Sequence, residues 1–289
     1  MPSKFFSDLS ETSNGNPCSP SNPLCFPQTL MLQNAICRNP GVDHGATATK
    51  PLTLSDHTQV NPTAQKSRII SHPINVPNML ISNIRSLARK IDELGSIASS
   101  NHVDMICITE TWLSPSIPDN LVSLPNFNLF RNDRSVSSGG GVCAYISSNI
   151  HYRRLPQYEC PSIESLWLSV RPKRLPRSIS VILLAVVYHS TVSRQTENAE
   201  LYSHIQCNVD SFLQLHPNAL VLVTGDFNFR STGFDANHVK RLVGLSQIIK
   251  VATRGDVILD WCLTNSKDNI LQSVQLPPIG TSDHYTILI

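Results

Sequence analysis

The chain has 289 residues, and 40% of them are hydrophobic, which is enough for one large or two small domains with a sizeable core. Its formal net charge of +2 is too small to indicate nucleic-acid binding by itself, so any DNA contact must come from a local basic face. The eight cysteines form no CxxC pair, which argues against a zinc site or a disulfide framework and fits a reducing compartment.

No apolar signal segment opens the chain, and the longest apolar run, which begins at Val181, is too short to cross a bilayer. We therefore expect a soluble, intracellular protein with no membrane partner.

Residues 1–74 differ in composition from the rest of the chain. They contain roughly half of the 20 prolines and few aromatic residues, and they show no sustained period of 2 or 3.6 residues. Such a segment buries too little apolar surface to offset the entropy lost on ordering. We predict a mostly disordered N-terminal extension over residues 1–74, whose role stays open, and one folded domain over residues 75–289.

Apolar runs of strand length begin at Asn78. Most are rich in Val, Ile and Leu and are bounded by Gly, Pro, Asn or Ser, which is typical of strands. The predicted strands cover residues 78–84, 103–109, 141–147, 165–170, 179–188, 219–225, 257–264 and 284–289.

Helical periodicity lies between these runs. The first predicted helix, residues 86–100, places Leu87, Ile91, Leu94 and Ile97 on one face. The second, residues 198–215, does the same with Leu201, Ile205, Val209 and Phe212, and residues 238–249 predict a shorter third helix. The pattern predicts a layered α/β fold, in which packed sheets are covered by helices.

Acids and amides follow several predicted strands. Glu110 and Asp226 end apolar runs directly, Asn83 closes the first run, Asn228 follows Asp226, and Asp283 with His284 precedes the last run. Strand ends in α/β folds face a shared crevice, and several oxygen ligands there suit Mg²⁺ or Mn²⁺. Singly, most of these residues are more often caps or turn residues. Only Asp260, a carboxylate inside an apolar run, requires a partner on its own account.

Motifs in this order resemble the endonuclease/exonuclease/phosphatase superfamily, which includes deoxyribonuclease I. They are SNIRSL, ITETWL, RNDRSVSSGGGVCAYI, ESLWLSV, VVYHS, VTGDFN, TRGDVILDWCLTN and TSDHYTI, between Asn78 and Ile289. TETWL, the RNDR and GGGV pair, and TRG before ILDWCLTN resemble the endonucleases of LINE-type, jockey-like non-LTR retrotransposons. The resemblance implies a four-layer sandwich of two packed mixed β-sheets flanked by helices, and phosphodiester hydrolysis with Mg²⁺ or Mn²⁺.

The resemblance also implies roles for the polar residues. Glu110, Asn83 and Asp283 match the metal site. Asp226 matches the aspartate that orients or deprotonates the attacking water, Asn228 its phosphate-positioning neighbour, and Tyr188 the tyrosine at the scissile phosphate. His284 matches the histidine that stabilises the phosphorane, and Asp260 the acid paired with it. Tyr188 is followed by His-Ser-Thr where the retrotransposon pattern has Arg-Pro-Pro, which weakens the match of that loop.

Basic residues beside these motifs are the candidate DNA contacts, namely Arg85, Arg131, Arg134 and Arg254. The basic turn over residues 171–177 is more simply a solvated hairpin tip. The glycine run, residues 139–141, lacks the Lys-Ser/Thr of a phosphate loop and more simply lets the chain turn into the next strand. Residues 264–280 are the predicted place for a target-sequence preference.

The leading hypothesis is a DNA-nicking endonuclease whose cut primes reverse transcription, acting in the nucleus with a reverse transcriptase supplied by another chain. An abasic-site repair nuclease or another phosphoesterase of the superfamily is the alternative enzyme. An inactive DNA-binding remnant is the alternative from another class. The target sequence and the oligomeric state stay open.

Overall fold

The computed structural model describes residues 76–134, 139–191, 195–229, 244–266 and 272–289, with side chains of the second helix described from Asn198 onward. The extension predicted over residues 1–74 lies outside the described residues. No helix in the described ranges combines the length and apolarity needed to cross a membrane.

Two mixed six-stranded sheets form the centre of the domain. The first has the order β11 (Val274–Leu276), β12 (Thr286–Leu288), β1 (Met79–Asn83), β2 (Met105–Thr109), β4 (Val142–Ser147) and β3 (Phe127–Asn132). The second has the order β5 (His151–Arg154), β6 (Ser165–Arg171), β7 (Val181–Tyr188), β8 (Ala219–Asp226), β10 (Asp260–Thr264) and β9 (Ser246–Gln247). Each sheet has one central parallel pair, β1 with β2 and β7 with β8.

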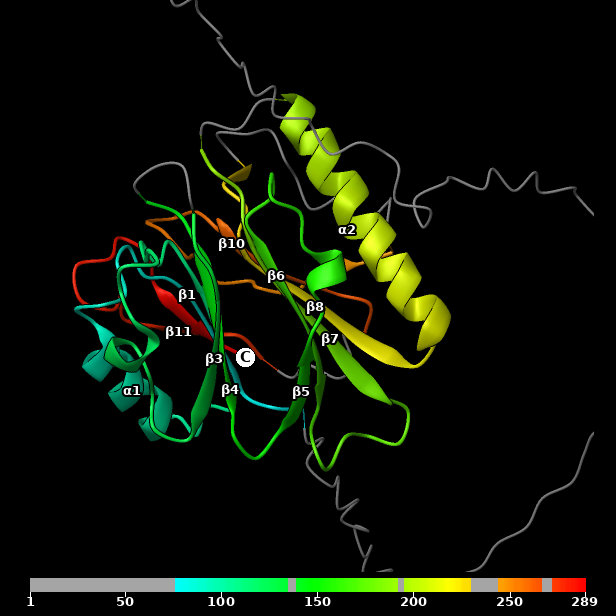
Figure 1. Ribbon diagram of the computed structural model, residues 1–289, viewed down its shortest axis with the longest axis horizontal. Coiled ribbons are helices and arrows are strands. Elements are labelled where there is room, and N and C mark those ends of the chain that lie inside the picture. Colours follow the sequence, from blue (N-terminus) through cyan, green and yellow to red (C-terminus); the bar gives the residue numbers. More distant parts are fainter. Residues whose placement is uncertain (1–75, 135–138, 192–194, 230–243, 267–271) are drawn as a thin grey trace, which may run out of the picture. The chain divides into compact units, whose positions relative to one another are not determined.

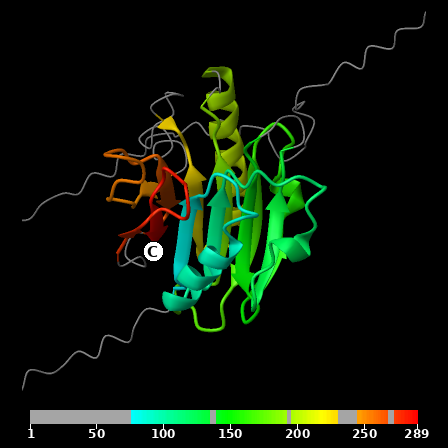
Figure 2. The same cartoon turned by 90° about the vertical axis from the view of Figure 1, so that its left-hand side faces the viewer.

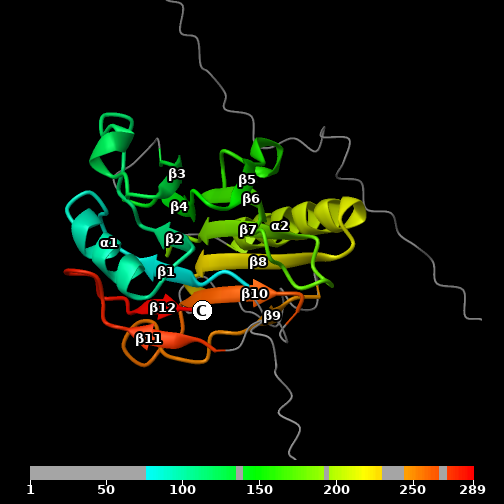
Figure 3. The same ribbon diagram turned by 90° about the horizontal axis from the view of Figure 1, so that it is seen from below.

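The helices cover the outer faces of the sheets. The sheets lie face to face, with α1 (Ile91–Ser100) outside the first and α2 (Gln195–Leu215) outside the second (Figure 1). Figure 2 looks onto the first sheet from the side of α1, and Figure 3 shows the layers from below. Short 3-10 helices, Asp119–Leu121 and Pro156–Tyr158, lie in the connections. The predicted four-layer sandwich is confirmed.

Three apolar cores separate these four layers, and strand alternation assigns residues to them. In β7, Ile182, Leu184 and Val186 point into the core between the sheets, while the intervening residues pack under α2. The first sheet packs its other face against α1, where Leu87 and Leu94 are fully buried. Strands buried on both faces explain the long uninterrupted apolar runs in the sequence.

The two longer predicted helices and all eight predicted strands are present, with shifted ends. The third predicted helix is wrong over its described part, since Ser246–Gln247 form β9 and pair with β10. Residues 238–243 of that prediction lie outside the described residues. The edge strands β3, β5, β9 and β11 escaped prediction because they are short or half-exposed and carry no apolar run.

The cysteines of the described residues are thiols. Cys107, Cys143 and Cys262 are buried, Cys160 and Cys207 are partly buried, and these five form no disulfide within the described ranges.

Candidate active site

The strand ends named from the sequence meet at one end of the sandwich. The parallel registers pair Asn83 with Thr109 in the first sheet and Tyr188 with Asp226 in the second. β10 runs antiparallel to β8 and starts at Asp260, directly opposite Asp226. Asp260 therefore opens its strand, whereas the sequence placed it inside an apolar run.

Alternation along the strands directs these polar groups inward. In β8, Leu220 and Leu222 face the core between the sheets, so the same two-residue period carries Asp226 into that layer. Tyr188 continues the inward series of β7 and belongs to the same core. The polar groups thus occupy the last inward-facing positions of otherwise apolar strands, at one end of the sandwich.

Three polar pairs join the two sheets at this end. Asn83 Nδ2 donates to Asp226 Oδ2 at 2.8 Å, and the Tyr188 hydroxyl donates to Glu110. His284, just before β12, bonds through Nδ1 to Asp260 Oδ2 at 2.7 Å. Each pair joins a residue in or next to a strand of one sheet to a residue of the other sheet, so segments distant in the sequence hold the site together.

Asp226 is 1% exposed, and both of its carboxylate oxygens accept hydrogen bonds. Oδ2 accepts from Asn83, and Oδ1 accepts from the backbone N–H of Asn228 at 3.1 Å. Burial and the nearby charge of Asp260 raise the pKa of Asp226 to about 7, although His284 and the amide donors offset part of this rise. A carboxylate held in this way is suited to accept a proton near neutral pH.

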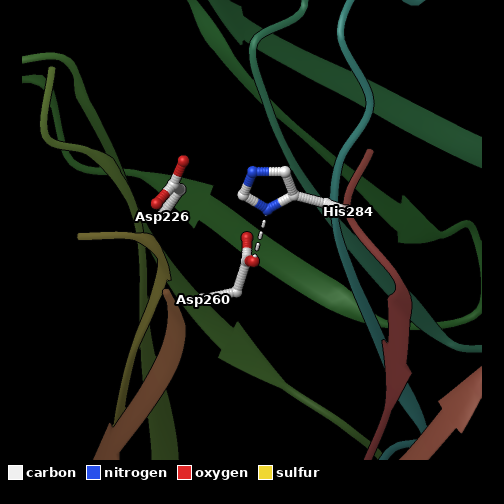
Figure 4. Close-up of side chains that lie close together, drawn as sticks. All are labelled: Asp226, Asp260 and His284. Carbon is white, nitrogen blue, oxygen red and sulfur yellow. Dashed lines mark hydrogen bonds and ion pairs between the residues drawn. The ribbon is translucent and has the colours of Figure 1, made fainter. Parts of the chain in front are cut away.

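His284 and Asp260 form a buried ion pair, and the Asp260 carboxylate is directed at the imidazole with Asp226 beside them (Figure 4). Because a carboxylate only accepts hydrogen bonds, Nδ1 carries the hydrogen and Nε2 remains the nitrogen not engaged by Asp260. Burial lowers the pKa of His284, but the charge and hydrogen bond of Asp260 outweigh it and leave the pKa above its ordinary value. The pair resembles other histidines that a carboxylate orients for work on a substrate.

Glu110 lies on a turn that departs from strand geometry. Its backbone has φ 56°, and its carboxylate accepts from the Tyr188 hydroxyl, the Trp112 indole and, at 3.2 Å, the backbone N–H of Gly140. The alternation of β2 would direct residue 110 away from the core between the sheets. The left-handed conformation instead turns the carboxylate toward Tyr188.

Backbone strain is concentrated at this end of the sandwich. Of the seven non-glycine residues with positive φ in the described ranges, five lie around the site: Arg85, Ser86, Glu110, Trp112 and Asn228. Such conformations cost about 1–3 kcal/mol each when the side chain does not favour them, and they cluster at functional sites. The clustering of strained residues therefore supports a functional site at the same end of the sandwich as the three polar pairs.

The sequence also matches the model of a known protein family. The model of the endonuclease/exonuclease/phosphatase family matches residues 78–284. The chain belongs to this family. A search of curated proteins gave no match.

Solved structures share the fold at low sequence identity. The endonuclease domain of TRAS1, a telomere-specific non-LTR retrotransposon, matches with a TM-score of 0.55 and 14% identity, over 74% of this chain and 97% of that one. Truncated Caenorhabditis elegans TDP2 matches with 0.54 and 15% identity, over 73% and 96%. The Xenopus laevis APE2 catalytic domain matches with 0.51 and 14% identity, over 73% and 90%. These identities support likeness of fold alone.

The donor set of this family member fits a hard divalent cation. Ligand atoms of Asp226, Asp260 and His284 lie within 4.8 Å of one another. Asn83 Oδ1 and Asp260 Oδ1 are buried and lack a hydrogen-bond partner among the described residues, an arrangement that normally requires a water or an ion. Carboxylate and amide oxygens are the ligands that Mg²⁺ and Mn²⁺ prefer.

Asp283 lies at the site, but its carboxylate faces arginines. Arg85 Nη1 reaches Asp283 Oδ1 at 3.2 Å, and Arg254 Nη2 reaches Oδ2 at 2.5 Å. Both guanidinium groups remain about half exposed, with 47% and 48% of the side chain accessible. The predicted metal ligand Asp283 thus joins two of the predicted DNA contacts and holds them at the rim of the site.

The other two predicted DNA contacts have protein partners. Arg131 is 13% exposed and donates to Asp133, Asp119 and the backbone carbonyls of Ile117 and Ser114. This arrangement favours a structural role for Arg131 over the predicted contact with DNA. Arg134 bonds to Glu164 and lies over the ring of Tyr188.

The basic turn over residues 171–177 lies at the far end of the sandwich from the site. It joins the end of β6 to the start of β7, and the site lies at the other end of β7. This placement agrees with its interpretation as a solvated hairpin tip.

Two hydroxyl side chains position the site and lie inside the family motifs, but sequence reasoning assigned them no role. Thr253 Oγ1 accepts the backbone N–H groups of Leu259 and Asp260 at 2.9 and 3.0 Å. Ser282 Oγ donates to the carbonyl of Asn83 at 2.6 Å and accepts from the N–H of His284 at 3.1 Å. A buried hydroxyl two residues before a catalytic candidate, as in SDH, is the sequence signal for such a support.

Proposed function

We propose that this chain is a divalent-metal-dependent phosphodiesterase that nicks DNA, as the endonuclease of a non-LTR retrotransposon does. The observation that carries the proposal is the set of three polar pairs that join the sheets at one end and bring Asp226, Asp260 and His284 together. Members of the matched family are hydrolytic nucleases and phosphatases.

Asp226 is the proposed base toward the attacking water. Its carboxylate is fixed by donors on both oxygens, and its raised pKa allows it to hold a proton transiently near pH 7. Asn228 donates its side-chain amide to the carbonyl of His189 at 2.9 Å, which fixes the turn that presents its backbone N–H to Asp226.

His284 is the proposed donor toward the developing charge on phosphate. Asp260 holds Nδ1, so Nε2 presents a hydrogen to a phosphoryl oxygen when the ring is protonated, which the raised pKa favours. The Tyr188 hydroxyl lies beside Glu110 and is proposed to contact the scissile phosphate. Glu110, Asn83 and the neighbouring carboxylates of Asp226 and Asp260 would hold a Mg²⁺ or Mn²⁺ ion. When bound, the ion would stabilise the negative charge on the phosphate and the leaving group as a Lewis acid.

A basic hollow beside the site is the proposed path of the DNA backbone. A cavity of about 600 Å³ is lined by Arg85, Arg89, Lys90 and Trp112, together with Ser86, Glu93, Gly280 and Thr281. Trp112 is 42% exposed, although its indole N–H is bound to Glu110. Basic groups bind phosphates and an exposed aromatic ring stacks on a sugar or base, so this lining suits a nucleic-acid strand better than a small ester.

The retrotransposon assignment is finer than the family. It is supported by the TETWL, RNDR with GGG, and TRG with ILDWCLTN motifs, and the structure gives each of them contacts at the site. Under this proposal the protein acts on chromosomal DNA in the nucleus, and a reverse transcriptase on another chain extends the nick. Target preference is proposed to lie in residues 264–280, of which 267–271 fall outside the described residues.

The test uses the full-length chain with supercoiled plasmid and Mg²⁺ or Mn²⁺. Wild type should convert the plasmid to open circles, and a chelator or the Asp226→Ala/His284→Ala double variant should abolish the conversion. Arg177→Ala, at the exposed turn far from the site, is the matched control and should nick normally. Failure of folded wild type to nick with either metal contradicts the proposal. Cleavage of abasic DNA or of small phosphate esters would then support the alternative phosphoesterase hypotheses. DNA binding without cleavage would identify an inactive remnant.

A further inference from the structure

Arg134 is enclosed by protein groups at the edge of the site. It follows β3, and β3 and β6 face each other across the two sheets (Figure 3). Its Cζ lies 5.6 Å from the centroid of the Tyr188 ring, and its side chain is 21% exposed. Nε donates to Glu164 Oε1 at 2.9 Å, and Nη2 donates to the same oxygen. A guanidinium stacked on an aromatic ring and paired with an acid is held in one orientation.

Glu164 connects this arginine to the rest of the site. Its second carboxylate oxygen accepts the backbone N–H of Gly141 at 2.6 Å, and its carbonyl accepts the backbone N–H of Tyr188 at 2.9 Å. Glu164 therefore fixes the backbone of Tyr188 while it also fixes the cation over the ring of Tyr188.

The glycine run makes room for the guanidinium. A Cβ on Gly140, which has φ +64°, would lie 2.3 Å from Arg134 Cζ, and one on Gly141 would lie 2.5 Å from Thr111 Oγ1. The N–H of Gly140 donates to Glu110 at 3.2 Å. The run is thus more than a turn into β4, because it packs against Arg134 while its amides hold Glu110 and Glu164.

We propose that Arg134 is a positioning residue, which holds the Tyr188 ring, and through its hydroxyl Glu110, in the geometry that the nicking reaction requires. This inference rests on the proposed function for its catalytic consequence, but the contact itself does not. It replaces the expectation that Arg134 binds a DNA phosphate. Arg134, Glu164 and Gly140 act as one unit, which joins the RNDR and GGG motifs in space.

Two variants move the guanidinium in different ways. Arg134→Ala removes it, whereas Gly140→Ala keeps the charge and displaces the flexible side chain with a methyl group. Because alanine at positive φ is strained by itself, Gly244→Ala is the control for that strain. Gly244 has φ +67°, and a Cβ there meets nothing within 4 Å.

The first readout does not depend on activity. In the full-length chain labelled with ring-¹³C tyrosine, Tyr188→Phe identifies the Tyr188 signal among the six tyrosines. Arg134→Ala and Gly140→Ala should both shift that signal, and Gly244→Ala should leave it in place. Thermal melts establish that each variant is folded. An unmoved Tyr188 signal in folded Arg134→Ala and Gly140→Ala overturns the proposal, whether or not the wild type nicks DNA.

The second readout separates positioning from phosphate binding. Both variants should lower kcat by roughly 10- to 100-fold through misplacement of the site, while KM, and the salt dependence of DNA binding measured with Ca²⁺, stay at wild-type values. Arg254→Ala provides the contrast, since loss of a phosphate contact should weaken binding and flatten the salt slope by about 1. Weaker binding with a flatter slope and an unchanged kcat in Arg134→Ala would assign Arg134 to DNA and refute the positioning role. An inactive wild type would contradict the proposed function and leave the tyrosine signal as the test of Arg134.

Discussion

Replacement of Asp226 by asparagine should stabilise the protein at alkaline pH while it removes the proposed base. Burial and Asp260 raise the pKa of Asp226 from 3.8 to about 7. An acid whose pKa is raised by folding binds more protons in the folded than in the unfolded state. The free energy of unfolding therefore falls as pH rises from about 4 to about 7. Asparagine keeps the size of the side chain and cannot ionise.

The magnitude follows from the pKa change. A rise of about 3 at about 1.36 kcal/mol per pKa unit gives an upper limit of about 4 kcal/mol at pH 8. One of the two N–H donors to Asp226 loses its acceptor in the amide, which costs about 1 kcal/mol, and water penetration reduces the gain further. We expect a net stabilisation of about 1–3 kcal/mol, with Tm higher by about 2–4 °C for each kcal/mol.

The assay is thermal and denaturant unfolding of the full-length chain in EDTA between pH 5 and pH 8. The difference between Asp226→Asn and wild type should more than halve by pH 5, where folded Asp226 is protonated. Asp283→Asn provides a control of opposite sign. Burial raises the pKa of Asp283, but its backbone hydrogen bond and the charge of Arg254 lower it below its ordinary value. The stability that Asp283 contributes is therefore present at pH 5–8 and lost in strong acid. The reasoning would be refuted if Asp226→Asn were no more stable than wild type at pH 8. It would also be refuted if the difference in stability between the two proteins did not shrink by pH 5.

Four further outcomes are expected. The kcat/KM for nicking should rise with pH through about 7, where Asp226 ionises, and higher Mg²⁺ should move this limb to lower pH; a flat profile from pH 5 to 8 contradicts the assignment of the base. His284→Ala should lower kcat by about 10²- to 10⁴-fold in single-turnover cleavage by folded protein, and it should also lower Tm because it leaves the buried Asp260 unpaired; a near-normal rate would exclude His284 from the chemistry. Arg131→Ala should cost about 3 kcal/mol in denaturant unfolding because it leaves Asp133 unpaired, and its DNA binding should keep the wild-type salt slope; a flatter slope would restore the predicted phosphate contact. Mg²⁺ should raise the Tm of wild type more than that of Asp226→Asn, since the cation relieves the repulsion between buried carboxylates, and an equal rise would place the cation elsewhere.

The sequence determined the layers of this protein and showed that polar residues follow its strands. Strands buried on both faces need continuous apolar runs, and helices on the surface need a 3.6-residue stripe, so both left a local signal. Asp226, Asn83 and Glu110 were recognisable because each ends such a run. The edge strands left no signal of this kind, and Ser246–Gln247 was wrongly predicted as helix because its pairing with β10 is a tertiary contact.

The tertiary structure alone decided which polar groups meet. Asn83 and Asp226 are 143 residues apart, and Arg134 and Glu164 are 30 apart, so no local pattern in the chain relates them. The resemblance implied a metal role for Asp283, and a position beside a matched motif suggested Arg131 as a DNA contact, but neither signal shows where a side chain points. The folded chain turns Asp283 toward Arg85 and Arg254 and encloses Arg131 among carbonyls and carboxylates. Hydrogen bonding and burial fix these orientations, and both depend on how the two sheets pack.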